Sequence, residues 1–436
     1  MAQIEVNNGH GSQGAAAAAS GRGRGLFRDL FSRELLRYLG PGFVVTIGFI
    51  DPGNWATNIA GGSQFGFRLL WVISVSTLML IFLQHTAARL GIASGRSLAA
   101  NIRSRFSRPW VWVFGVTILA ACVATQLAEY LGAALGFALL LHIPVFLGAP
   151  LSLVIVYLLI AGRQYDNLER VIVVLLAVIA LCYIAELYLV HPDWGTALPH
   201  WAVPSVSGKS IFLAMAMLGA IVMPHNIYLH SDVILSREWD VEPQHRRRLM
   251  RFELVDTTLA MGMGWLVNSA MIIVAAAVFF RAGVTVDSIK QASASLKPLV
   301  GSLSALLFGV GLLAAGLSSS VTSTLATANV ICSYLGRPAD PHSRFFKLAL
   351  GVFPLAPIVL IASGLNPFRA LVLSQVVLSL QLPLTIVPLL LLARRREVMG
   401  DLHLRALGYT VGWLVAAVII GLNLFLLYQT FVPRGI

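Results

Sequence analysis

The sequence is poor in charged residues. Asp, Glu, Lys and Arg make up 11% of its 436 residues, whereas soluble domains contain about 25%. Over half of the residues are hydrophobic, and apolar stretches of about 20 residues, each long enough to cross a bilayer, recur along almost the whole chain. The shortage of charge excludes an ordinary soluble domain and predicts an all-α integral membrane protein that has the lipid bilayer as its surroundings.

Cysteine and catalytic motifs are scarce as well. Cys122, Cys182 and Cys332 lie in apolar segments at unrelated spacings, which excludes a disulfide framework and a cysteine-based zinc site. The sequence contains no His-Glu-x-x-His motif, and no nucleophile–base pair or cofactor motif stands out. We therefore expect neither enzymatic activity nor a resident cofactor.

Hydropathy predicts about eleven spans, after a tail. Residues 1–25 are rich in Ala, Gly, Ser, Asn and Gln and predict a disordered cytoplasmic tail. Residues 26–436 predict a single transmembrane domain. The fourth span is short, and the eighth has the least defined start, because Gly301–Leu303 can belong to a loop. The spans cover approximately residues 40–61, 69–91, 110–137, 146–162, 169–190, 210–235, 254–281, 302–334, 346–363, 369–393 and 406–430.

The net charge of +12 comes largely from arginines in every second loop. The intervening loops carry few, such as Arg68, Arg281 and Arg369. This alternation follows the positive-inside rule, which places the N-terminus in the cytoplasm and, after an odd number of spans, the C-terminus outside. It also argues against a nucleic-acid partner. The short loops and the lack of a transit peptide favour a bacterial inner (plasma) membrane.

Two quartets interrupt the apolar spans, Asp51-Pro52-Gly53-Asn54 in the first and Met223-Pro224-His225-Asn226 in the sixth. Proline removes a helical hydrogen bond, and inside a bilayer freed backbone groups are tolerated only where they line a cavity or meet a ligand. A single kink would be structural as readily as functional. Two matching kinks that carry an acid, an amide and a sulfur indicate a metal-ion site.

The residue types predict which metals would bind. Asp51 offers an anionic oxygen and Asn54 a neutral oxygen about one helical turn later. A thioether ligand from Met223 would favour transition metals over Mg²⁺ and Ca²⁺, although methionine also fills gaps in cores. Mn²⁺, Fe²⁺, Co²⁺ and Cd²⁺ all suit this set of ligands.

Other polar residues within the spans are candidates for a proton pathway. Glu129 needs a neutralising partner, and protonation is the least costly one. His225 and His230 are either proton acceptors, hydrogen-bonded gate residues or structural. Metal binding would also displace a proton from Asp51. Gln375 in the tenth span is either a late oxygen ligand or an interhelical hydrogen-bonding residue.

The two breaks lie five spans apart, so the second unit has inverted topology. Inverted repeats with broken first helices hold their substrate near the midplane between those helices. The first repeat is expected at about 38–190 and the second at about 208–393, with an extra helix at about 405–430.

These motifs resemble the natural resistance-associated macrophage protein (NRAMP) family of divalent metal transporters. The resemblance also rests on Gly40-Pro41-Gly42, Ala88-Arg89-Leu90-Gly91, Leu229-His230-Ser231 and Leu373-Ser374-Gln375-Val376. It implies a LeuT-like fold of two inverted five-helix repeats, alternating access, and uptake of Mn²⁺ or Fe²⁺ toward the cytoplasm, usually with protons. The implied metal ligands are the side chains of Asp51, Asn54 and Met223 and the carbonyl of Ala220, joined in some conformations by the carbonyl of Gly48 and the side chain of Gln375.

The chain departs from the family pattern where protons are expected to move. Gln126 stands in place of the usual aspartate, and Lys347 and Leu348 in place of two arginines. We hypothesise that metal selectivity is ordinary, whereas proton coupling is weakened, rerouted through Glu129 and His230, or absent. A proton-uncoupled facilitator and a non-transporting metal sensor are the alternative functions.

Overall fold

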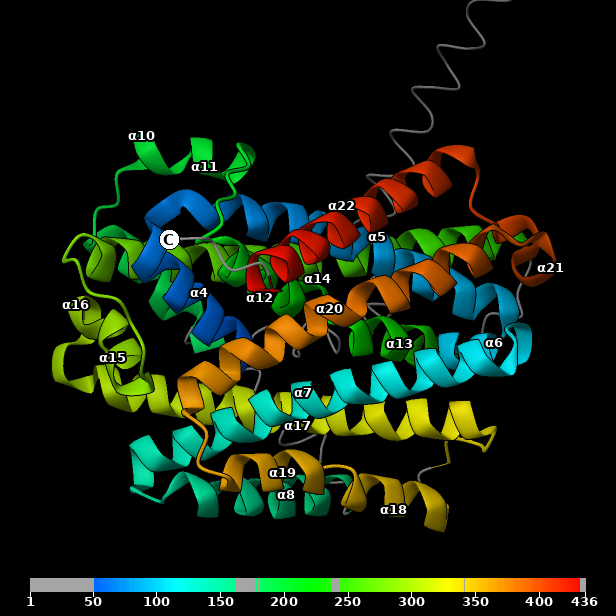
Figure 1. Ribbon diagram of the computed structural model, residues 1–436, viewed down its shortest axis with the longest axis horizontal. Coiled ribbons are helices and arrows are strands. Elements are labelled where there is room, and N and C mark those ends of the chain that lie inside the picture. Colours follow the sequence, from blue (N-terminus) through cyan, green and yellow to red (C-terminus); the bar gives the residue numbers. More distant parts are fainter. Residues whose placement is uncertain (1–50, 162–176, 179, 237–242, 341, 432–436) are drawn as a thin grey trace, which may run out of the picture.

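The computed structural model describes residues 51–161, 177–178, 180–236, 243–340 and 342–431. Throughout these residues the regular elements are helices, which confirms the all-α prediction. Eight helical stretches of this part are long and apolar enough to cross a membrane. The long helices run roughly along one common direction, which is horizontal in Figure 1.

The predicted spans have helical counterparts in the described residues, wholly or in part. The stretch Pro52–Ser94 contains the first two, and the fourth and fifth are represented by the shorter apolar helices Val145–Ile160 and Ala180–Leu189. The predicted tail and the first half of the first span lie outside the described residues. The main helices are α4 (Pro52–Phe65), α5 (Leu70–Ser94), α7 (Arg108–Leu141), α8 (Val145–Ala161), α12 (Ile211–Val222), α13 (Pro224–Val233), α14 (Pro243–Ala275), α17 (Ser304–Leu335), α18 (Arg344–Val352), α19 (Leu355–Ala362), α20 (Pro367–Arg394) and α22 (Ala406–Phe431).

Both predicted breaks coincide with helix ends. The sixth span divides into α12 and α13 at Met223, which has a φ of 38° and a ψ of 94°. That backbone conformation is rarely adopted by residues other than glycine. On the other side, α4 begins at Pro52, and Asp51 before it is extended, with a φ of −89° and a ψ of 161°. The half-helix expected before Asp51 lies outside the described residues.

The ninth predicted span is interrupted, which the hydropathy pattern did not indicate. Helix α18 ends at Val352 and α19 begins at Leu355. The cause is Pro354, since a proline nitrogen has no hydrogen to donate to the carbonyl four residues earlier.

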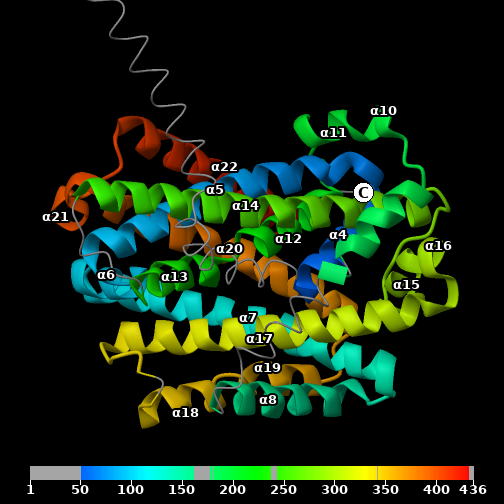
Figure 2. The same ribbon diagram turned by 180° about the vertical axis from the view of Figure 1, so that it is seen from behind.

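Helices α7 and α17 form a central pair that runs side by side in two opposite views (Figures 1 and 2). Their backbones approach closely at two glycines. A Cβ on Gly136 would lie 2.6–2.7 Å from atoms of Leu313, and one on Gly316 would lie 2.4 Å from the backbone nitrogen of Ala133. Small residues allow such approach where lipid supplies no hydrophobic force between helices.

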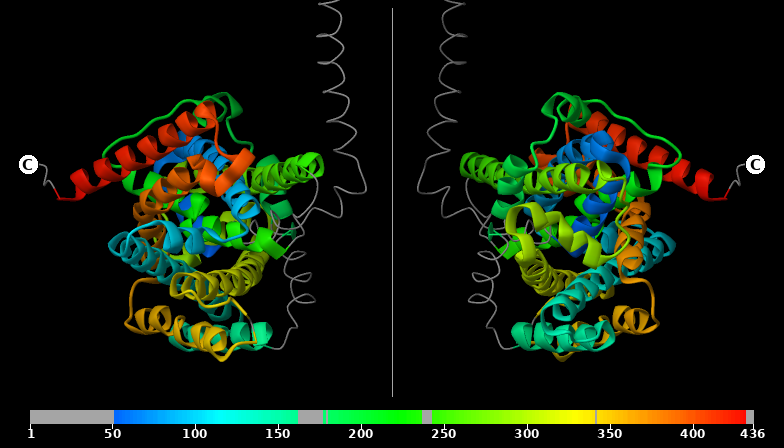
Figure 3. Two further views of the ribbon diagram at one scale, coloured as in Figure 1. Left: turned by 90° about the vertical axis from the view of Figure 1, so that its right-hand side faces the viewer. Right: turned by 90° about the vertical axis from the view of Figure 1, so that its left-hand side faces the viewer.

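The other helices pack on both sides of this pair. Helices α8, α18 and α19 pack against α7 and α17 along one side. Helices α4, α5, α12, α14 and α20 contact one another on the other side and enclose the two breaks. The last helix, α22, packs on α20 and α12, and its C-terminal end extends away from the body of the protein (Figure 3).

The short helices mark the two ends of the molecule. α6 (Leu98–Arg105) and α21 (Arg396–Met399) lie at one end, whereas α10 (Trp194–Ala197), α11 (Pro199–Ala202), α15 (Ile289–Ser293) and α16 (Lys297–Val300) lie at the other (Figure 1). The α6 end holds the arginine-rich connections after the second and tenth spans. The arrangement therefore agrees with the alternation of basic loops.

The contact between α7 and α17 leads to a stability prediction. Gly136→Ala forces the two backbones apart, and overpacking of this kind costs about 1–3 kcal/mol. We expect a melting temperature several degrees below that of the unmodified protein in detergent. Gly262→Ala in α14 is the matched control, because a Cβ there meets nothing within 4 Å. Equal melting temperatures for the two variants would contradict the close packing.

Candidate metal centre

Asp51 caps the N-terminus of α4. Its Oδ2 accepts a hydrogen bond of 3.0 Å from the backbone N–H of Gly53, and its Oδ1 accepts one of 3.0 Å from the N–H of Asn54. The first turn of a helix favours a negative charge, because its N–H groups have no partner within the helix. The carboxylate is 1% exposed, so the unwound turn holds a buried acid in a defined orientation.

The side chain of Asn54 joins the two broken helices. Its Nδ2 donates to Oδ1 of Asp51 at 2.5 Å and to the carbonyl of Ala220, in the last turn of α12, at 2.9 Å. In a continuous helix that carbonyl would accept from the residue four positions later, which is Pro224 and has no N–H. The proline thus makes the Ala220 carbonyl available to α4.

The same relation between a proline and the carbonyl four residues earlier holds at the first break. Pro52 removes the hydrogen-bond donor for the carbonyl of the residue four positions earlier, which is Gly48. Gly48 itself lies outside the described residues. The two predicted backbone ligands are therefore equivalent positions relative to the two prolines.

Met223 forms the break between α12 and α13 and is 1% exposed. Its Sδ accepts a hydrogen bond of 3.2 Å from Nδ2 of Asn226. Its backbone carbonyl accepts from the N–H of Asn226 at 3.0 Å. The thioether therefore lies within the buried turn that begins α13, three positions after Ala220.

Gln375 of α20 lies between the two breaks. A Cβ on Gly53 would lie 2.0 Å from its Nε2 and 2.8 Å from Oδ2 of Asp51, so the amide of Gln375 and the carboxylate flank the same glycine. A Cβ on Gly219 in α12 would lie 2.0 Å from the backbone carbonyl of Gln375. The side-chain Oε1 is buried and has no hydrogen-bond partner among the described residues.

The structure thus brings together four of the predicted ligand residues, Asp51, Asn54, Ala220 and Gln375, with Met223 at the adjoining break. A carboxylate, two amides, a carbonyl and a thioether can bind a divalent transition metal. Within the described residues no cluster of three or more His, Cys, Asp or Glu side chains could hold a metal instead.

Glu129 lies in α7 beside the first break. It is buried and accepts a hydrogen bond from the hydroxyl of Ser319 in α17. One turn further along α7, a Cβ on Gly132 would lie 2.1 Å from Cγ of Pro52. The carboxyl group is therefore placed in the helix that contacts the start of α4.

The two candidate histidines belong to separate networks. His225, at the start of α13, lies with its Nδ1 3.1 Å from Oγ1 of Thr125, one turn before Glu129 in α7. His230 lies further along α13 with its Nδ1 2.7 Å from Oε1 of Gln84 in α5. His225 thus contacts α7 one turn before Glu129, whereas His230 contacts α5.

His230 is part of a cluster that the sequence analysis missed. Its Nε2 lies 3.8 Å from Oε1 of Glu253 in α14, and Oε2 of Glu253 lies 2.5 Å from Nδ1 of His85 in α5. The predicted seventh span began at residue 254, so Glu253 was assigned to a loop. Because α14 begins at Pro243, this acid is instead buried within the helix. His85 could have been noticed in the sequence, because it is a histidine inside the second predicted span.

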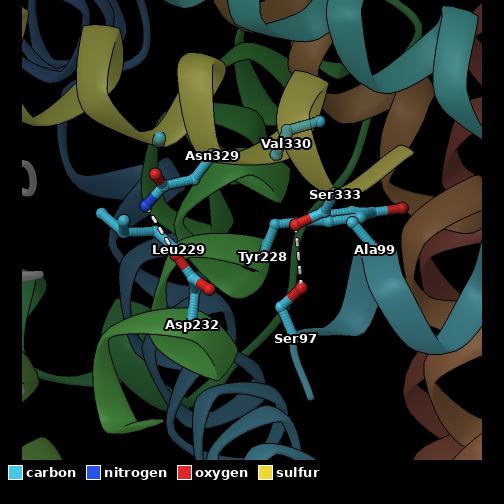
Figure 4. A pocket seen from close by; sticks show the side chains of 9 residues that line it. Ser97, Ala99, Tyr228, Leu229, Asp232, Asn329, Val330 and Ser333 are labelled. Carbon is cyan, nitrogen blue, oxygen red and sulfur yellow. Dashed lines mark hydrogen bonds between the residues drawn. The ribbon is translucent and has the colours of Figure 1, made fainter. Parts of the chain in front are cut away.

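Polar contacts link the far end of α13 to α17 (Figure 4). Asp232 accepts a 2.6 Å hydrogen bond from Asn329, the hydroxyls of Tyr228 and Tyr334 are 3.0 Å apart, and Ser97 before α6 lies 3.2 Å from Ser333. The space left among these side chains is about 10 Å³, which is about that of one water. The half-helix α13 is therefore tied to the central pair near the α6 end.

The residues that depart from the family pattern lie in different surroundings. Gln126 is buried in α7 and donates from Nε2 to Oγ1 of Thr327 at 3.0 Å. Leu348 in α18 is 60% exposed, and Lys347 beside it is also exposed. The α17 contact of Gln126 is thus a neutral hydrogen bond, and positions 347 and 348 face away from the protein interior.

Comparisons with solved structures agree with this fold. A manganese transporter of Eremococcus coleocola, solved in complex with an aromatic bis-isothiourea substituted compound, is 31% identical with a TM-score of 0.76, over 92% of this chain and 89% of that chain. MhsT in complex with L-phenylalanine is 16% identical with a TM-score of 0.62, over 91% of this chain and 99% of that chain, and this likeness concerns the fold alone. The predicted LeuT-like architecture is confirmed.

Sequence comparisons identify the relatives. The divalent metal cation transporter MntH of Caldanaerobacter subterraneus is 39% identical over 415 residues, which cover 94% of this chain and 97% of the relative. The protein of the same name from Clostridium acetobutylicum is 42% identical over 402 residues and 92% of each chain. A family model described as natural resistance-associated macrophage protein-like matches residues 42–429. The chain therefore belongs to the NRAMP family of integral membrane transporters.

Proposed function

We propose that the protein imports divalent transition metal ions, Mn²⁺ and Fe²⁺ among them, by alternating access. The observation that carries the proposal is the contact between the two broken helices, where Asn54 bridges the carboxylate of Asp51 and the carbonyl freed by Pro224. Relatives that share about 40% of the sequence are named divalent metal cation transporters, which supports the same substrate class here.

In this proposal Asn54 aligns the oxygen ligands with one another. Its NH₂ group donates to two of the proposed ligand oxygens, on Asp51 and Ala220. A cation that binds these oxygens replaces both hydrogen bonds, and rotation of the amide then presents its oxygen to the cation. The same amide can therefore position the two oxygens through its NH₂ group and contribute its own oxygen to a bound cation.

Selectivity comes from Met223 in this proposal. Mg²⁺ and Ca²⁺ take oxygen ligands, so a thioether in place of an oxygen lowers their affinity relative to Mn²⁺, Fe²⁺ or Cd²⁺. The Asp51 carboxylate supplies the charge that any divalent cation requires. The acid therefore sets affinity, and the sulfur sets discrimination.

Transport requires that α4 and α13 move relative to a fixed frame. The α7–α17 pair, whose backbones are in contact at two glycines, is suited to be that frame. Three contacts with α17 hold the α6 end closed, and they are made by Asp232 and Tyr228 of α13 and by Ser97 before α6. In this proposal these contacts open when the metal is released at the α6 end. Alternating access by movement of broken helices follows the general pattern of inverted-repeat transporters.

The setting in the cell is part of the proposal. We assign the α6 end to the cytoplasm, because its connections carry the arginines, and the C-terminus to the outside of a bacterial plasma membrane. Residues 26–436 form one transport domain with repeats at about 38–190 and 208–393. The transported metal is a substrate, and no resident cofactor is needed.

Proton coupling in this proposal uses the residues next to the site. Glu129 and the Thr125–His225 pair line one face of α7 and the start of α13, and Asp51 releases its own proton when metal binds. His230 lies in the separate Glu253 cluster, so a path through it needs movement of α13. The alternatives are a proton-uncoupled facilitator and a metal sensor that does not transport.

The proposed metal ligands lead to a prediction about uptake. In proteoliposomes, Asp51→Ala abolishes Mn²⁺ uptake, because the buried site then lacks its anionic ligand. Met223→Ala retains uptake but weakens Mn²⁺ affinity on the order of tenfold, a loss of about 1.4 kcal/mol, and Ca²⁺ then competes more strongly. Radiotracer or fluorescent-dye uptake with Ca²⁺ as competitor measures both effects.

The control for Met223→Ala is Met261→Ala in α14, an equally buried methionine away from the breaks. We expect it to leave the ratio of Mn²⁺ to Ca²⁺ affinity unchanged. Unchanged discrimination in Met223→Ala would count against a sulfur ligand. Absence of uptake of any divalent metal by the unmodified protein would reject transport and favour the sensor.

The proposed proton pathway leads to a prediction about acidification during uptake. With Mn²⁺ uptake and internal pH recorded together, we expect acidification in the unmodified protein and its loss in Glu129→Gln, which keeps residual Mn²⁺ uptake. Gln126→Ala is the control, since it alters the same helix without removing a titratable group and should keep the proton-to-metal ratio. Acidification that persists in Glu129→Gln would exclude Glu129 from the path, and uptake without acidification in the unmodified protein would identify a facilitator.

A further inference from the structure

A second cavity lies away from the metal centre, near the α6 end. It has a volume of about 820 Å³ and is bounded by the first turns of α7, the last turns of α17, and the turn between α18 and α19. Its walls are mostly apolar, with Val116, Leu119 and Ile331 among them. Two arginines, Arg103 at the end of α6 and Arg108 at the start of α7, also line it.

The tryptophans of α7 indicate the level of the membrane surface here. Trp110 and Trp112 are 55% and 70% exposed, and Trp112 lines the cavity. Exposed tryptophans are enriched where lipid headgroups meet the hydrocarbon region. Arg108 precedes them in the chain, and Val116 and Leu119 follow. The cavity therefore has a basic rim at headgroup level and an apolar wall at the level of the acyl chains.

The positive charge of this rim is not balanced by nearby acids. No residue that lines the cavity is acidic, and none of the salt bridges found among the described residues involves Arg103 or Arg108. The guanidinium group of Arg103 lies against Gly336 at the end of α17. A third guanidinium, that of Arg337, lies 4.1 Å from the ring centre of Phe345, which is a wall residue.

We propose that this cavity binds one anionic phospholipid, with its phosphate between Arg103 and Arg108 and an acyl chain along α7 and α17. Basic pockets between membrane helices are suited to anionic headgroups, and a volume of this size suits a largely apolar ligand. The charge selects an anion, and the apolar wall selects one that carries hydrocarbon. A phospholipid such as phosphatidylglycerol meets both conditions.

The cavity is linked to the half-helix α13 through Tyr334. Tyr334 lines the cavity, and its hydroxyl lies 3.0 Å from that of Tyr228 in α13. A lipid packed against Tyr334 holds this ring in place and so favours the arrangement in which α13 is tied to α17.

Lipid binding to the purified, delipidated full-length chain tests the proposal independently of transport. Native mass spectrometry compares phosphatidylglycerol with phosphatidylcholine of the same acyl chains, and we expect tighter binding of the former. In the double variant Arg103→Gln/Arg108→Gln, phosphatidylglycerol affinity falls about 20- to 30-fold, as expected for two arginines near an anionic headgroup. Arg105→Gln, exposed in the same helix but outside the cavity, is the matched control and should bind like the unmodified protein.

Two tryptophan substitutions on α7 test the role of the apolar wall of the cavity. Val116→Trp fills the wall and should weaken binding by about tenfold or more, whereas Val113→Trp, also exposed on α7 but outside the cavity, should not. Melting temperatures close to that of the unmodified protein verify folding of each variant. Equal affinity for the two lipids, equal effects of the paired variants, or displacement of the lipid by inorganic phosphate at matched concentration would each overturn the proposal.

Discussion

The hydrogen bond from the Asn54 amide to the Ala220 carbonyl is the contact on which the rest of the centre depends. It exists because Pro224 has no N–H to donate to that carbonyl. The same amide also reaches Asp51, so one side chain aligns an acid from α4 with a backbone oxygen from α12. In a continuous helix the Ala220 carbonyl would accept a hydrogen bond from the residue four positions later, and it would not be available to a cation.

Irregular backbone at membrane depth needs protein around it, since lipid offers no hydrogen bonds. Three glycines make this enclosure possible. Gly53 leaves room for the side chain of Gln375, Gly132 for the ring of Pro52, and Gly219 for the backbone of α20. Each brings a neighbouring helix so close that solvent and lipid are excluded. The burial of Asp51, at 1% exposure, is a consequence of this packing.

The polar contacts between α7 and α17 use hydroxyl, amide and carboxyl groups. Gln126 bonds Thr327, Tyr130 bonds Thr324, and Ser319 bonds Glu129. Gln126 is buried and makes a neutral hydrogen bond to Thr327, whereas Leu348 lies on the exposed face of α18, so the two departures from the family pattern lie in different surroundings. A carboxyl–imidazole contact, between Glu253 of α14 and His85 of α5, lies elsewhere in the protein.

The sequence by itself determined the membrane location, the approximate spans, the two breaks and the chemistry of their side chains. These follow from local properties, since hydropathy and the missing proline N–H act within about one turn or one span. It could not determine that Pro354 divides the ninth span, because proline is often accommodated within membrane helices. Indeed α20 continues through Pro383 and Pro388. Only the tertiary structure decided that Gln375 meets Gly53, that His225 contacts α7 whereas His230 contacts α5, and that Glu253 pairs with His85. Those contacts join helices far apart in the chain, and their existence depends on how closely the glycines let the helices approach.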